Sequence, residues 1–115
     1  GAQVVLSDYH PAVLQLLERN ARANSLEGRV EVRRLAWGEE GAEEPWLRGD
    51  FDLVLAADTV YYPEGVEPQF RTARAALGDR HSGMLLLAFK HREIVDLTML
   101  FDIARRTGFA LRSEE

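Results

Sequence analysis

The stretch FDLVLAADTVYYPE, residues 51–64, decides the fold predicted for this chain. Its apolar run from Leu53 to Ala57 ends abruptly at Asp58 and is followed by two tyrosines and Pro63. This pattern is typical of a buried parallel strand that carries polar side chains at its carboxyl end. In an open α/β sheet, ligands bind at that edge. The alternative interpretation is an ordinary buried strand followed by a loop with a capping acid.

Outward from this stretch, the apolar periodicity alternates between that of strands and that of helices. The predicted strands cover residues 3–6, 30–35, 53–57 and 84–89, and a further strand is predicted to start at 109–112. The predicted helices cover residues 11–24, 68–77 and about 93–107, and residues 39–50 are predicted to form a surface excursion. This order predicts an α/β fold with a parallel sheet and right-handed crossovers.

Individual residues indicate where several of these helices begin and end. Pro11 is predicted to lie in the first turn of its helix, and Pro68 is predicted to open the next helix, which Gly78 ends. One helical turn is expected around Trp46. The continuous apolar run at residues 84–89 predicts a central strand that is covered on both faces.

Length and charge limit the kind of protein that this chain can be. With 115 residues it holds one domain at most. Fourteen basic and nineteen acidic side chains give a net charge of -5. The composition therefore shows no excess of positive charge that would indicate binding to nucleic acid or to an anionic membrane. The longest apolar run, residues 84–89, is too short to cross a bilayer.

The absence of cysteine excludes disulfides, thiolate metal sites and a cysteine nucleophile. It is compatible with a reducing compartment, and the first residues show no signal-peptide pattern. We therefore expect a cytoplasmic protein, with the nucleus as the alternative. The sequence opens directly in a strand without an initiator methionine, so we expect residues upstream of Gly1. The three histidines are scattered, which favours surface positions over metal binding; they are His10, His81 and His91.

Polar or aromatic side chains follow four of the predicted strands. They are Asp8, Trp37, Asp58 with Tyr61, and residues 90–92. An acid between a strand and a helix can accept hydrogen bonds from the vicinal hydroxyls of a ribose, or it can simply cap the helix, and Asp8 fits both interpretations. The indole of Trp37 suits an adenine face, with a place at the edge of the core as the alternative.

Several segments together resemble the seven-β-strand (class I) protein-lysine methyltransferases, the kind that modifies chaperones and translation elongation factors. The matching segments are Ser7-Asp8, Val13-Leu14 with Asn20 and Asn24, Leu35-Ala36-Trp37-Gly38, and residues 51–61. The most specific piece is the D-x-V-Y motif after the family's fourth strand, met here by Asp58, Val60 and Tyr61. The resemblance covers nearly the whole chain, from the family's second strand to its sixth, so residues 1–115 are expected to form one partial methyltransferase domain.

The resemblance implies an enzyme that uses S-adenosyl-L-methionine to methylate a lysine ε-amine of a protein substrate, such as an elongation factor or a chaperone. It implies three cofactor-binding residues: Asp8 at the ribose, Trp37 at the adenine, and Ala57, whose small side chain lets the backbone approach the cofactor. It implies two catalytic residues: Asp58, which faces the substrate amine, and Tyr61, which lines the lysine channel. No metal or second cofactor is implied, and neither nucleic acid nor a membrane is an expected partner.

The sequence departs from the family pattern at its N-terminal end. The family's first strand and its glycine-rich E-x-G-x-G-x-G turn have no counterpart, and the implied Rossmann-like doubly wound sheet is therefore incomplete. In the expected strand order 3-2-1-4-5 the missing strand is the centre. We expect either a piece of a longer protein, with two half-sheets, or direct pairing of the family's second and fourth strands. Ala36 stands where members often carry an acid, and Arg92 matches a basic residue that has no assigned role.

Three other functions fit parts of the sequence. A small-molecule methyltransferase would use the same cofactor, but the D-x-V-Y motif favours a protein substrate. A catalytically silent Rossmann-like domain that serves as an interaction module is supported by the missing glycine-rich turn. A nicotinamide-dependent reductase would also place Asp8 on a ribose, but it requires the same turn and leaves residues 58–61 unexplained.

Overall fold

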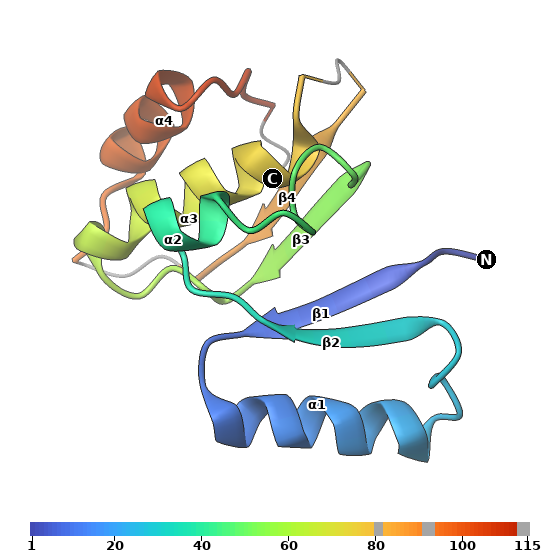
Figure 1. The fold of residues 1–115 in the computed structure, drawn as a ribbon. Coiled ribbons are helices and arrows are strands. Elements are labelled where there is room, and N and C mark those ends of the chain that lie inside the picture. Colours follow the sequence, from blue (N-terminus) through green and yellow to red (C-terminus); the bar gives the residue numbers. More distant parts are fainter. Residues whose placement is uncertain (80–81, 91–93, 113–115) are drawn as a thin grey trace. The chain divides into compact units, whose positions relative to one another are not determined.

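The chain divides into two compact units, Gly1–Ala36 and Trp37–Glu115. The computed structural model describes residues 1–79, 82–90 and 94–112. Each unit contains one pair of parallel strands, which Figure 1 shows together with the helices beside each pair. His81, His91 and Arg92 lie outside the described residues.

The first unit is a strand, a helix and a parallel strand: β1 (Val4–Asp8), α1 (Pro11–Ala23) and β2 (Val30–Arg34). The strands pair in register from Val4 opposite Val30 to Asp8 opposite Arg34. The helix runs alongside this pair (Figure 1). Pro11 occupies its first turn, as predicted, and the N-cap is His10, whose Nδ1 accepts a hydrogen bond from the Ala12 amide at 3.1 Å.

The second unit holds the organising stretch of the sequence. Its elements are α2 (Glu39–Ala42), β3 (Leu53–Ala57), α3 (Pro63–Leu77), β4 (Met84–Ala88) and α4 (Leu97–Arg106). The two strands are parallel, with Leu53 opposite Met84 and Ala57 opposite Ala88. The hydrophobic core lies between this sheet and the last two helices, and its buried members are Val60, Val66, Phe70, Val95, Leu100, Ile103 and Ala104.

The strand arrangement confirms an α/β fold with parallel strand pairs. Within the described residues, β1 pairs with β2 and β3 pairs with β4, in two separate sheets. Each unit thus contributes one parallel pair of strands.

The predicted start of α3 is wrong. α3 begins at Pro63, after the extended Tyr62, so Pro68 lies inside the helix and does not open it. Both prolines are compatible with a first turn, but only Pro63 follows a residue in the extended conformation of an N-cap. A hydrogen-bonded turn does form around Trp46, where the Leu47 amide donates to the Glu44 carbonyl at 3.0 Å, and a short helix that was not expected, α2, precedes it.

The prediction that β4 is covered on both faces is also wrong for the described residues. Leu85 and Leu87 pack against the core, whereas Met84 and Leu86 point the other way and are 52% and 56% exposed. β3 alternates in the same way, with Leu55 on the exposed side. The reason is that the core beneath this sheet is built with α3 and α4 on one face only.

Towards the end of the chain the structure also differs from the sequence pattern. α4 begins at Leu97, after Asp96, whose side chain accepts a hydrogen bond from the Thr98 amide at 3.1 Å. Residues 109–112, predicted to start a strand, form no regular secondary structure, because no described strand lies beside them to pair with. No helix in the described part of the chain is long and apolar enough to span a membrane.

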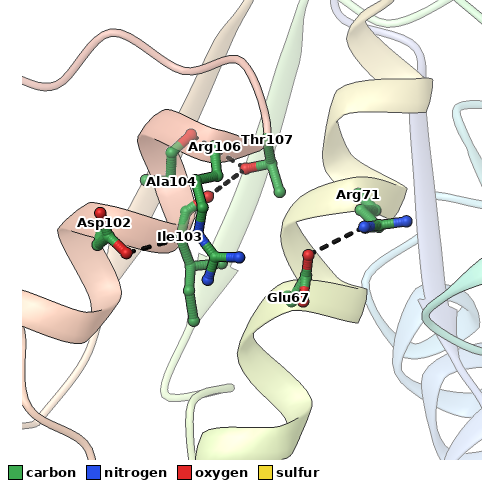
Figure 2. A network of polar contacts seen from close by, with 7 residues as sticks. All are labelled: Glu67, Arg71, Asp102, Ile103, Ala104, Arg106 and Thr107. Carbon is green, nitrogen blue, oxygen red and sulfur yellow. Dashed lines mark hydrogen bonds and ion pairs between the residues drawn. The ribbon is translucent and has the colours of Figure 1, made fainter.

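The outer surfaces of α3 and α4 carry ion pairs one turn apart. Arg71 pairs with Glu67 at 3.0 Å, and Arg106 pairs with Asp102 at 3.4 Å (Figure 2). These side chains are largely exposed, so each pair contributes only about 0–1 kcal/mol to stability. Thr107 ends α4 by sharing its hydroxyl hydrogen bond between two main-chain carbonyls of the last turn (Figure 2).

Gly78 ends α3, as predicted, and its replacement by alanine is expected to destabilise the protein. Its φ of 63° and ψ of -148° belong to a region that is nearly restricted to glycine, and an added Cβ would lie 2.9 Å from the Cα of Gly49. The backbone strain alone costs about 1–3 kcal/mol. The midpoint of urea unfolding of Gly78→Ala should therefore fall below that of the wild type.

The matched control is Gly65→Ala in the same helix. A Cβ at Gly65 meets nothing within 4 Å, and alanine is about 1 kcal/mol better than glycine inside a helix. Its urea midpoint should equal or exceed that of the wild type. A Gly78→Ala protein as stable as the control would contradict the conformational argument.

Candidate functional site

Residues 58–62 connect β3 to α3 and are attached to the sheet at their first residue. The Asp58 amide donates to the Ala88 carbonyl at the end of β4, at 2.7 Å. The φ of Asp58 is 54°, a left-handed conformation that is uncommon for residues other than glycine and that aspartate tolerates better than most. Backbone strain of this kind gathers at functional sites. It decides here in which direction the carboxylate leaves the sheet edge.

The middle of this loop is held by the core and by α3. Val60 is buried against Val66 and Phe70. Next to it, the hydroxyl of Thr59 accepts a hydrogen bond from the side-chain amide nitrogen of Gln69. The loop ends at Tyr62, whose carbonyl accepts from the Gly65 amide at 3.1 Å in the first turn of α3.

The side chains of Asp58 and Tyr61 remain at the surface of this firmly held loop. Tyr61 is 48% exposed, Tyr62 is exposed more fully, and Asp58 is exposed as well. Asp58 and Tyr61 also interact with other residues of the chain. A carboxylate beside aromatic rings attracts a cation, through its charge and through the faces of the rings. The arrangement is therefore suited to receive a protonated amine.

Trp37 belongs to the same unit, and its position is set by the glycine that follows it. Gly38 has a φ of 112°, and its amide donates to the hydroxyl of Thr72 on α3 at 2.9 Å. The same hydroxyl donates to the Pro68 carbonyl at 2.9 Å, so α3 holds this turn through a buried side chain. The Trp37 side chain itself is 43% exposed, which leaves part of the indole available to a ligand.

Ala57 is the last residue of β3 and lies opposite Ala88 in the parallel register. Both alanines are exposed. At this register position both strands therefore carry only a methyl group, which suits the close approach of a ligand to the backbone.

Asp8 lies at the carboxyl end of β1, in the first unit. Its Oδ1 accepts a hydrogen bond from the His10 amide at 2.9 Å, so it organises the turn into α1, while the carboxylate as a whole stays exposed. Its main-chain carbonyl accepts from the Leu35 amide at 3.0 Å. Asp8 does not cap α1, because the N-cap is His10, and its place on a ribose stays a prediction.

The structure thus brings Ala57, Asp58 and Tyr61 together at one strand end, and Trp37 belongs to the same unit. Asp8 belongs to the other unit. No group of three or more histidine, aspartate or glutamate side chains among the described residues could hold a metal ion.

Sequence reasoning missed two polar residues on the inner side of α3, Gln69 and Thr72. They support the loops that carry Asp58 and Trp37. The signal in the sequence was the position of Gln69, which falls three residues after Val66 and one before Phe70. At helical spacing it therefore lies on the same apolar face as these two residues. A polar residue on such a face indicates a buried hydrogen bond, but the partner cannot be read from the spacing.

These features define an α/β protein with parallel strands that presents acidic and aromatic side chains at the carboxyl ends of those strands. The chain belongs to the lysine methyltransferase family, whose sequence profile matches residues 1–106. This confirms the resemblance seen in the sequence.

Curated relatives support the same assignment. The chain is 34% identical over 108 residues to the protein N-lysine methyltransferase METTL21A of Mus musculus, covering 87% of this chain and 46% of the relative. It is 29% identical over 125 residues to the protein-lysine N-methyltransferase EFM6 of Saccharomyces cerevisiae, covering 96% of this chain and 49% of the relative. The chain therefore spans about half the length of these relatives. No solved structure matches it at a significant level.

Proposed function

We propose that the protein containing this chain transfers a methyl group from S-adenosyl-L-methionine to the ε-amine of a lysine in another protein. The observation that carries this proposal is the D-x-V-Y loop, in which Asp58 and Tyr61 are exposed on a backbone held by β4 and α3. It occurs in a member of the lysine methyltransferase family. Relatives that match most of this chain are named protein-lysine methyltransferases.

Three residues of this chain are our candidates for holding the adenosine part of that cofactor. The exposed carboxylate of Asp8 would accept hydrogen bonds from the ribose, and the half-exposed indole of Trp37 would contact the adenine. Ala57 leaves the sheet edge open to the cofactor. When bound, S-adenosyl-L-methionine supplies an electrophilic methyl group on a positively charged sulfonium. The glycine-rich turn that the family uses for the methionine part has no counterpart in residues 1–115.

Asp58 captures and aims the substrate lysine rather than removing its proton. A free lysine has a pKa of about 10.4, so forming the neutral amine at neutral pH costs roughly 4 to 5 kcal/mol. A nearby carboxylate favours the ammonium form and cannot lower this cost by its charge. Its contribution is orientation, because displacement at a methyl group requires the amine nitrogen to be in line with the leaving sulfur.

Tyr61 contributes a wall to the channel through which the lysine enters. Its ring and that of Tyr62 are exposed next to Asp58 in the chain. A ring face attracts an ammonium group by about 0.5–2 kcal/mol, depending on how far the site excludes water. Exclusion of water around the lysine also favours the neutral amine that reacts.

We further propose that the substrate is a translation elongation factor or a chaperone and that the protein works in the cytoplasm. The substrate proposal is supported by the similarity of residues 7–61 to the methyltransferases that modify these proteins. The compartment is supported by the absence of cysteine from the sequence.

The proposed function is tested with the full-length protein, methyl-labelled cofactor, and a purified elongation factor or chaperone. We expect label on a lysine, located by mass spectrometry of the substrate. Label only in small molecules would favour a small-molecule methyltransferase. No label, together with no heat of binding for S-adenosylhomocysteine, would favour a silent interaction module.

Trp37 provides a more specific test of cofactor binding. Because stacking of an aromatic ring on a base contributes about 1–3 kcal/mol, Trp37→Ala should raise the Kd of S-adenosylhomocysteine by roughly 5- to 150-fold. Calorimetry measures this Kd directly. The control Trp37→Phe keeps a ring face and should lie between the wild type and Trp37→Ala. Equal Kd values for all three proteins would remove Trp37 from the adenine site.

A further inference from the structure

α3 carries two kinds of polar side chain. Glu67 and Arg71 pair with each other at the surface of the helix, as Figure 2 shows. Gln69 and Thr72 are instead buried, with 5% and 3% of their surface exposed. A buried polar side chain costs stability unless it is hydrogen-bonded, so each of these two positions calls for a structural reason.

Among the described residues, the side chain of Gln69 makes one hydrogen bond, and this bond reaches the loop that carries Asp58. Its amide nitrogen donates to the hydroxyl of Thr59, the residue directly after Asp58. Its carbonyl oxygen is buried without a hydrogen-bond partner among the described residues. An apolar side chain of similar size would fill the same space without leaving this oxygen unpaired. The amide therefore does little for packing, and its specific effect is on the position of Thr59.

We propose that Gln69 is a positioning residue for the methyl transfer reaction: it holds Thr59 so that the neighbouring Asp58 and Tyr61 are aligned with the incoming lysine. This inference rests on the proposed function. Gln69 lies outside the D-x-V-Y motif, on α3, and its side chain bonds to a loop residue ten positions earlier in the sequence.

The backbone of Asp58 shows why such support is needed. Asp58 and Ser25 are the two non-glycine residues with positive φ in the described part of the chain. A left-handed residue persists only where its surroundings hold it. The bond from the Asp58 amide to Ala88 holds one side, and the bond from Gln69 to Thr59 holds the other. Without the second bond, Asp58 is free to relax towards a common conformation, which moves its carboxylate.

The test compares Gln69→Leu, Thr59→Val and the double variant Thr59→Val/Gln69→Leu in the full-length protein. Three quantities are measured: kcat and KM for the protein substrate, the Kd and stoichiometry of S-adenosylhomocysteine, and the hydrogen exchange rate of single amides by NMR. The matched control is Thr72→Val, which removes a buried polar group from the same helix but holds Gly38 instead of Thr59.

For Gln69→Leu we expect kcat/KM to fall by roughly 10- to 100-fold, since a displacement of about 1 Å at a reacting group has effects of this size. The KM for the protein substrate should rise, while the Kd of S-adenosylhomocysteine stays within a few-fold of the wild type. The Asp58 amide should exchange faster and the Gly38 amide should not. Thr72→Val should show the reverse exchange pattern and a raised cofactor Kd.

The double variant tests whether Gln69 acts through Thr59. If Gln69 acts only through Thr59, either single replacement already removes the whole interaction, so the double variant should be no more impaired in kcat/KM and no faster in Asp58 amide exchange than either single variant. A double variant as impaired as the sum of the two single variants would overturn the coupling between the two residues.

Two further outcomes would overturn the inference. The stoichiometry of S-adenosylhomocysteine binding measures the fraction of protein that is folded. If Gln69→Leu lowers kcat only by as much as it lowers this fraction, and KM is unchanged, then Gln69 serves only to maintain the fold. If the Asp58 amide exchanges at the wild-type rate, Gln69 does not order the loop. A wild-type protein without transferase activity would instead contradict the proposed function, and the exchange rates would still decide whether Gln69 positions Asp58.

Discussion

Replacing Asp58 by asparagine is expected to lower kcat/KM for the protein substrate by about 100-fold or more while leaving the cofactor Kd within a few-fold of the wild type. The carboxylate attracts the lysine ammonium and aims it, and loss of a well-positioned group at a reacting centre has effects of this size. Asparagine keeps the shape of the side chain and tolerates the left-handed φ of 54° at this position. Label transfer to the substrate and calorimetry with S-adenosylhomocysteine give the two numbers.

Asp58→Ala serves as the second variant, because it removes the side chain altogether. It should abolish transfer, and the strain of alanine at positive φ should also lower the stability of the loop by about 1–2 kcal/mol. Comparing Asp58→Asn with Asp58→Ala separates the effect of losing the negative charge from the effect of changing the loop backbone. An active Asp58→Asn enzyme would remove the carboxylate from its assigned role, even if Asp58→Ala were inactive.

Replacing Asp8 by alanine is expected to weaken binding of S-adenosylhomocysteine by about 100-fold or more. The exposed carboxylate would accept hydrogen bonds from two ribose hydroxyls, and hydrogen bonds to charged groups contribute about 1.5–3 kcal/mol each. Calorimetry on the full-length protein measures the change. Methyl transfer should fall accordingly at limiting cofactor and recover in part at high cofactor concentration.

The control for Asp8 lies two residues further on. Asp8 also accepts a hydrogen bond from the His10 amide, so its removal loosens the turn into α1. His10→Ala removes only the N-cap acceptor for Ala12, at a cost of about 1 kcal/mol in stability. It should change the cofactor Kd little. If His10→Ala and Asp8→Ala weaken binding equally, Asp8 contributes through the turn and not through the ribose.

Strong local signals made much of the second unit predictable. β3 and β4 were expected within about one residue of their observed bounds, because runs of apolar residues between turn residues identify buried strands. Gly78 was expected to end α3 because the helix terminus there needs a backbone that only glycine adopts easily. The position of Asp58 and Tyr61 at a strand end follows directly from these bounds.

Predictions were wrong where two residues were equally suited to begin a helix. They were also wrong where the outcome depended on which elements pack against a strand. Pro63 and Pro68 both suit the start of a helix, and only the extended backbone of Tyr62 selects the first. The exposed face of β4 depends on which sides of the sheet the helices cover, and the same apolar run is compatible with one covered face or two.

By itself, the sequence determined the alternation of β1 to β4 with α1, α3 and α4, the family, and the strand end at which Asp58 and Tyr61 lie, since these depend on residues close together along the chain. Only the tertiary structure decided how that strand end is held. The bonds from Gln69 to Thr59 and from Thr72 to Gly38 join residues 10 and 34 positions apart. Such partners meet only after the helix packs on the sheet, because packing and not local spacing determines which buried polar groups face each other.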